Sequence, residues 1–105
     1  MKLSLAIEYK KLPADIKSPD ALSRFLITEA VTRRFPQGIP RTESRIYGKL
    51  LDQFYEEKSE IEIDEPTFLL VKESLDQSLL PAHLSSWKWT LLTHLEESMI
   101  NKKKE

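Results

Sequence analysis

The chain has no cysteine and contains only two glycines and two histidines in 105 residues. The absence of cysteine excludes disulfides, thiolate nucleophiles and cysteine metal sites, and it favours a cytoplasmic protein because small secreted domains often depend on disulfides. Two glycines are too few for a glycine-rich phosphate loop. The histidines, His83 and His94, are predicted to lie about three helical turns apart, too far to share one metal ion. We therefore expect no catalytic, cofactor or metal site.

Long hydrophobic runs are also missing. No stretch approaches the ~18 apolar residues of a membrane span, and the first residues alternate between apolar and polar instead of forming the apolar segment of a signal peptide. The composition, 40% hydrophobic and 31% charged, is typical of a globular domain. We predict one domain at 1–100, followed by a charged flexible tail at 101–105.

Charge is distributed very unevenly along the chain, although the net charge is only −1. From Arg33 to Lys49 there are five basic residues and one acid, whereas from Asp52 to Asp76 there are nine acids and two lysines. Three explanations fit this division. The two halves of the chain neutralise each other, or the basic half binds an acidic protein, or it binds nucleic acid.

The first half predicts a strand followed by two helices. Leu3, Leu5 and Ile7 alternate with polar residues, which indicates a half-buried strand. Ser18 and Pro19 form a typical helix start, with Ser18 as the cap, and the helix is expected to end near Arg34. A second helix is predicted to begin near Thr42 as its cap. Its broad apolar stripe predicts burial on more than one side, and is made of Ile46, Tyr47, Leu50, Leu51, Phe54 and Tyr55.

The second half predicts a strand and two more helices. Ile61 and Ile63 alternate with acids, and Asp64 before Glu65-Pro66 is a predicted helix cap. The apolar face of that third helix is predicted to contain Phe68, Val71, Leu75 and Leu79. The last helix is predicted to start at Pro81, with Leu84, Trp87, Leu91, Leu95 and Met99 on one stripe.

The predicted fold is therefore α+β and mainly α, with about four helices and a small two-stranded β-sheet in the order β-α-α-β-α-α. Two strands have two open edges, and open edges favour pairing with another chain. A homo-oligomer that pairs through a strand edge is accordingly expected.

The stretch from Thr32 to Arg45, TRRFPQGIPRTESR, connects the first two predicted helices and holds four arginines. Arg33 and Arg34 lie at the end of one helix, where the helix dipole favours cations. Arg41 and Arg45 lie at the start of the next, where the dipole disfavours them. This second placement predicts either a carboxylate from the acidic half or an external anion nearby.

Trp89 cannot share the core-facing stripe with Trp87, because residues two apart lie on different sides of a helix. It is either sandwiched in a helix buried on both sides or part of a second exposed surface with Leu92 and Tyr55. Exposed aromatic residues often mark protein contacts. The predicted partner-binding residues are Arg33, Arg34, Arg41, Arg45 and Trp89.

The whole pattern resembles a loose group of small proteins encoded by bacteriophages and prophages. The resemblance covers about residues 3 to 97 and depends on Asp20-Ala21-Leu22, the strand and cap from Ile61 to Glu65, the segment Phe68–Lys72, and the closing run Leu91–Glu96. It implies a phage or prophage accessory protein that binds other proteins. The arginine connector and the tryptophans depart from the group's pattern, and the group supplies no site residues.

Together these features favour a non-enzymatic protein-interaction module of phage or prophage type, which acts in assembly or in the modulation of a host protein. The alternative is a nucleic-acid-binding regulator that uses the basic stretch from Arg33 to Arg45.

Overall fold

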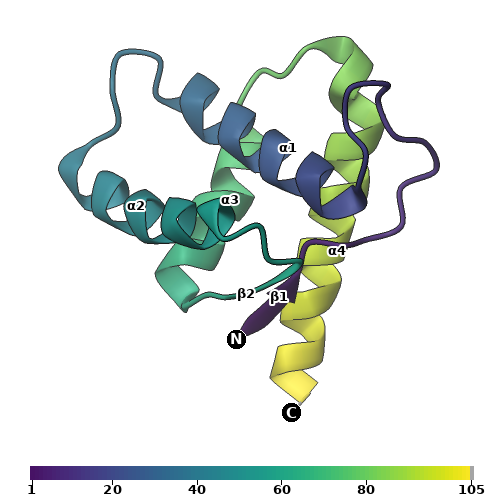
Figure 1. The fold of residues 1–105 in the computed structure, drawn as a ribbon. Helices are drawn as coiled ribbons and strands as arrows, with labels where there is room; N and C mark the ends of the chain where they lie inside the picture. Colours follow the sequence, from purple (N-terminus) through teal and green to yellow (C-terminus); the bar gives the residue numbers. More distant parts are fainter. Residues whose placement is uncertain (105) are drawn as a thin grey trace.

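The computed structural model describes the backbone of residues 1–104 and the side chains of residues 1–99. Within residues 1–104 the chain is mainly helical α+β, with four α-helices and a two-stranded antiparallel sheet in the predicted order β-α-α-β-α-α (Figure 1). The predicted charged flexible tail, 101–105, lies outside the residues whose side chains the structure describes. The elements are β1 (Lys2–Ser4), α1 (Pro19–Arg34), α2 (Arg41–Tyr55), β2 (Glu60–Glu62), α3 (Glu65–Gln77), a 3-10 turn η1 (Ala82–Leu84) and α4 (Ser85–Lys104).

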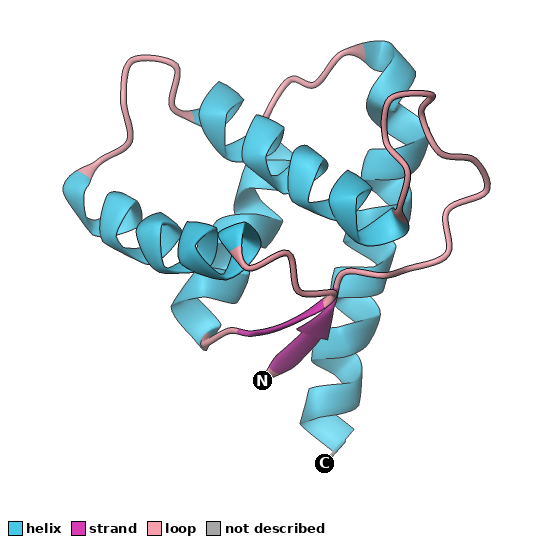
Figure 2. Cartoon of the chain, in the orientation of Figure 1, coloured by secondary structure: helices cyan, strands magenta, loops and turns pink. Residues whose placement is uncertain are grey.

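Helix α3 is the centre of the arrangement. It packs against α1, α2 and α4, so that α2 and α4 flank it on different sides (Figure 1). Figure 2 shows the long loops that join β1 to α1 and α1 to α2. Because α2 packs mainly on α3 and no further helix covers its far side in the described chain, its remaining surface faces solvent.

The predicted strands form and pair. Leu3 lies opposite Ile61, and both side chains are buried. Hydrogen bonds continue beyond the short strands, since the N–H of Leu5 donates to the carbonyl of Ser59 at 2.6 Å. Ile63 also buries its side chain. The alternation seen in the sequence thus lays one face of the sheet on the helices, as predicted.

Two of the predicted helix caps are confirmed. The Ser18 hydroxyl accepts from the N–H of Ala21 at 3.4 Å, and Asp64 accepts from the N–H of Thr67 at 3.0 Å. These bonds satisfy backbone donors that the first turn of a helix leaves free. The hydrogen bonds from Thr67 favour the carboxylate, and they lower the pKa of Asp64 below its ordinary value.

The predicted start of α2 was wrong. Thr42 is not the cap, because the helix begins at Arg41 directly after Pro40 and no side chain caps it. Pro40 has an extended backbone, with φ −59° and ψ 154°, and the helical conformation begins at the next residue. Backbone geometry therefore starts α2 without the side-chain hydrogen bond that a threonine cap supplies.

The burial predicted for α2 was also wrong. Instead of being buried on more than one side, the helix buries only Leu50 and Phe54 completely, and Tyr55 is exposed. Its apolar stripe is broad in sequence, but Ile46, Tyr47 and Leu51 are only partly buried. The opposite side of the helix is available for a contact outside the chain.

Leu79 was assigned to the buried face of α3, but it is 88% exposed. The helix ends at Gln77, and Ser78 turns the backbone to an extended conformation with ψ 145°. Leu79 then lies in the connector that leads to Pro81, beyond the reach of the helical period that predicted its burial.

Candidate interaction surface

The structure divides the four arginines of the basic stretch into two groups. Arg33 pairs with Glu29, one turn earlier on α1, at 3.2 Å between nitrogen and oxygen. Both side chains are partly exposed, and such a pair on a helix surface contributes only a few tenths of a kcal/mol. Arg33 is therefore engaged within its own helix.

Arg34 is used inside the molecule. Its guanidinium donates to the buried Ser74 hydroxyl and to the Glu73 carboxylate of α3, each at 3.3 Å. It also lies 4.8 Å from the ring centroid of Phe35, a favourable cation–π distance. This residue joins the end of α1 to α3, so part of the basic half is indeed neutralised by the acidic half.

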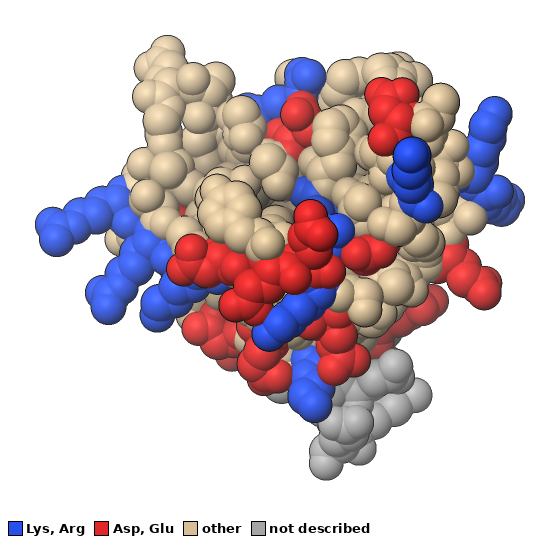
Figure 3. Space-filling view, in the orientation of Figure 1, with Lys and Arg blue, Asp and Glu red and all other residues tan. Residues whose placement is uncertain are grey.

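Arg41, Arg45 and Lys49 form the second group and remain exposed. Each lies four positions after the previous one, which places the three in a row on one side of α2 with a rise of about 6 Å per step. Among the described residues, none of the three has a carboxylate within ion-pair distance. Figure 3 shows basic side chains projecting from the left side of the molecule, where α2 begins.

This row is locally unfavourable for the helix that carries it. Cations near a helix N-terminus oppose the dipole, and like charges four residues apart repel each other by a few tenths of a kcal/mol per pair. The carboxylate neighbour that would offset these costs for Arg41 and Arg45 is not found among the described side chains. The unfavourable placement of Arg41 and Arg45 is therefore not offset by an ion pair among the described side chains.

The other end of α2 carries the opposite charge. Asp52 and Glu56 are exposed, and the last turn of the helix contains no basic residue. Glu56, the residue that directly follows α2, forms an ion pair with Lys58 at 2.7 Å, whereas Asp52 is in none of the ion pairs among the described residues. Acids at a helix C-terminus again oppose the dipole. In Figure 3 acidic side chains gather in a band across the lower middle of the molecule. We call the exposed side of this helix the α2 outer face, and it consists of Arg41, Ser44, Arg45, Gly48, Lys49, Asp52 and Glu56.

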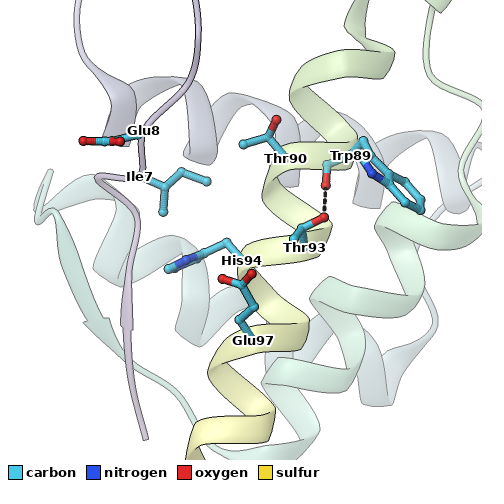
Figure 4. Close-up of a pocket in the computed structure, with 7 residues that line it drawn as sticks. All are labelled: Ile7, Glu8, Trp89, Thr90, Thr93, His94 and Glu97. Atoms are coloured by element: carbon cyan, nitrogen blue, oxygen red, sulfur yellow. Dashed lines mark hydrogen bonds between the residues drawn. The ribbon is translucent and has the colours of Figure 1, made fainter.

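Trp89 does not join this surface. It is 71% exposed, but it lies on α4, which is separated from α2 by α3 (Figure 1). Figure 4 shows its indole directed away from Ile7 and Glu8. Of the two alternatives for Trp89, the sandwiched helix does not fit its exposure, and the exposed surface does not include Leu92, which is buried. The structure therefore brings Arg41 and Arg45 together and leaves Trp89 apart.

A groove of about 320 Å³ runs beside α4 and contains His94 (Figure 4). The His94 Nε2 lies 2.9 Å from the carbonyl oxygen of Ser4. Because a carbonyl only accepts, Nε2 carries the proton and donates it to this bond. The ring thus attaches α4 to the outer edge of β1. The groove is lined by Ile7, Glu8, Trp89, Thr90, Thr93, His94 and Glu97.

A side chain also occupies the outer edge of β2. The Gln53 amide nitrogen donates to the carbonyl of Glu62 at 2.7 Å, and the Glu62 N–H donates to the Gln53 amide oxygen at 2.9 Å. This amide takes the place of a neighbouring strand. Together with His94 on β1, it satisfies edge groups that another chain would use for strand pairing.

Comparisons with known proteins do not indicate a function for this chain. The chain matches no protein-family model, no curated protein and no solved structure. Within the described residues, no three His, Cys, Asp or Glu side chains are placed to hold a metal ion. A search of the same residues found no helix with the length and apolar character needed to cross a membrane.

The two groups of arginines are expected to differ in their effect on stability. Arg34→Ala should lower the free energy of unfolding by about 1–2 kcal/mol, because it removes a charged hydrogen bond to a buried hydroxyl. Arg41→Ala should leave it unchanged or raise it by a few tenths of a kcal/mol, because it removes repulsion. Urea denaturation of both variants checks this difference, and equal losses would contradict the division.

Proposed function

We propose that this chain is a non-enzymatic protein-interaction module of phage or prophage type, which works in the cytoplasm in assembly or in the modulation of a host protein. Its contact surface is the α2 outer face. The observation that carries this proposal is the row of exposed cations, Arg41, Arg45 and Lys49. The row begins at the N-terminus of α2, where cations oppose the helix dipole, and it has no ion-pair partner among the described residues.

The mixed charge of the α2 outer face favours a protein partner over nucleic acid. Binding to nucleic acid depends on the number of phosphates that basic residues neutralise. Here Asp52 and Glu56 follow the cations on the same side of the helix, and they would repel a continuous row of phosphates. A protein surface can offer acids opposite the first half of the helix and bases opposite the second.

Site-specific photo-crosslinking in cells tests this proposal. A photoreactive phenylalanine analogue is placed at Ser44, on the α2 outer face, and as a matched control at Glu96, an exposed position on α4. We expect a nuclease-resistant protein adduct from position 44 only. The double substitution Arg41→Glu and Arg45→Glu should abolish that adduct. A nuclease-sensitive adduct, or equal adducts from both positions, would overturn the proposal.

A further inference from the structure

The charges on the α2 outer face form two blocks of opposite sign along one helix. Arg41, Arg45 and Lys49 occupy the first half, and Asp52 and Glu56 occupy the second. Arg45 and Asp52 are seven residues apart, so they point in almost the same direction at a separation of about 10 Å along the axis. They cannot reach each other directly, and both lie on the side opposite the buried Leu50 and Phe54.

The two blocks are related by a common midpoint. Arg45 and Asp52 are centred between Gly48 and Lys49, and Arg41 and Glu56 are centred on the same point. A second α2 that crosses there in the antiparallel direction would therefore set each of the two arginines opposite an acid of the other copy. Such an arrangement has two-fold symmetry, in which the same patch of both chains forms the interface.

We propose that the partner bound by the α2 outer face is a second copy of this chain, with the two α2 helices packed antiparallel. This inference rests on the proposed function, because it names the partner of that same surface. The pair offsets the unfavourable positions of Arg41, Arg45 and Asp52, whereas Lys49 lies opposite Gly48 of the other copy and gains no acid. The cationic start of one helix faces the acidic end of the other, and the two helix dipoles run in opposite directions.

The centre of the proposed contact is suited to close approach. Gly48 lies at the crossing point and is exposed, and apart from its sequence neighbours and the backbone of its own helix nothing lies within 4 Å of where its Cβ would be. Glycine within a helix costs roughly 1 kcal/mol relative to alanine, and at this position it lets two backbones approach. The sheet offers less for self-association, since Gln53 and His94 bind its outer edges.

Sedimentation equilibrium with a charge-swap series tests this dimer. The proteins are the full chain, Arg45→Glu, Asp52→Arg and the double swap of both. We expect the wild-type chain to dimerise at low salt and to dissociate as salt rises, because the contacts are exposed ion pairs. Each single substitution places like charges opposite each other and should weaken the dimer at least about tenfold. The double swap should restore it.

The outcomes separate this inference from the proposed function. A wild-type chain that stays monomeric at roughly 1 mM at low salt, a dimer that the single substitutions leave unchanged, or a double swap that fails to restore dimerisation would each overturn the inference. If position 44 still crosslinks to a different protein in those cases, the proposed function stands. Melting curves of all four proteins confirm that they fold, which is expected because Arg45 and Asp52 are exposed.

Discussion

Replacing Phe68 with alanine is expected to lower the free energy of unfolding by about 3–5 kcal/mol. Phe68 is 2% exposed and lies on α3, the helix that packs against the three others. The substitution removes a large apolar side chain and leaves a cavity that its neighbours fill only partly. Since domains of this size are stable by about 5–15 kcal/mol in total, the variant should lose a large part of its stability.

Leu69 provides the matched control for Phe68. It is the next residue on the same helix, and it is 40% exposed. Leu69→Ala should cost less than about 1.5 kcal/mol, because much of its surface already contacts water. Urea denaturation of both variants at neutral pH gives the comparison. Similar losses for the two would mean that α3 does not present this face to the core.

The second large effect is expected at alkaline pH and depends on Tyr9. Burial raises the pKa of Tyr9 to about 12. The Ser23 hydroxyl donates to the carbonyl of Leu5 at 2.7 Å. Because a hydroxyl has only one proton to give, the Tyr9 hydroxyl must donate to Ser23, at 2.7 Å. An ionised tyrosine cannot make this bond.

The direction of the pH effect follows from linkage. In the unfolded chain Tyr9 titrates near pH 10, the ordinary value, whereas the folded chain holds the proton up to about pH 12. The stabilisation from Tyr9 is therefore complete below pH 10 and is lost as the pH rises from 10 to about 12. The loss should amount to about 2–3 kcal/mol.

Tyr9→Phe isolates this contribution. The pKa of Tyr47 is also raised by burial, so stability will decline at alkaline pH in both proteins. The decline should be smaller in the phenylalanine variant, which has no hydroxyl to ionise at position 9. The free energy of unfolding, measured in urea from about pH 8 to about pH 12, gives the two curves. Parallel curves would show that Tyr9 does not titrate as the structure indicates.

Local sequence signals were sufficient for most of the fold. The caps at Ser18 and Asp64 depend on neighbouring residues, and the structure confirms them. The alternation from Leu3 to Ile7 correctly predicts which side chains are buried, but the strand that it predicts ends already at Ser4. The predictions were wrong where tertiary contacts or the local backbone conformation decide where a helix begins, ends or is buried. Leu79 continued the helical period but lies beyond the end of α3. The start of α2 depends on the backbone of Pro40 instead of a threonine cap.

The candidate surface was only partly readable from the sequence. Arg34 looked like Arg41, but its role depends on Ser74 and Glu73, which reach it only through the packing of α3 on α1. Lys49 and Asp52 contribute to the uneven charge distribution, but the predicted partner-binding residues do not include them. Their regular spacing from Arg45 was visible, but which side of α2 faces solvent is decided by tertiary contacts.

A dilution series followed by nitrogen–proton correlation NMR shows whether the α2 outer face binds a second copy of this chain, because it reports the contact surface residue by residue. Spectra are recorded at low salt from roughly 1 mM down to roughly 0.05 mM protein. We expect concentration-dependent chemical-shift changes that are concentrated on the backbone amides from Arg41 to Glu56. These changes should vanish in Arg45→Glu. Shifts centred on β1 and β2, or no shifts over the whole range, would contradict it.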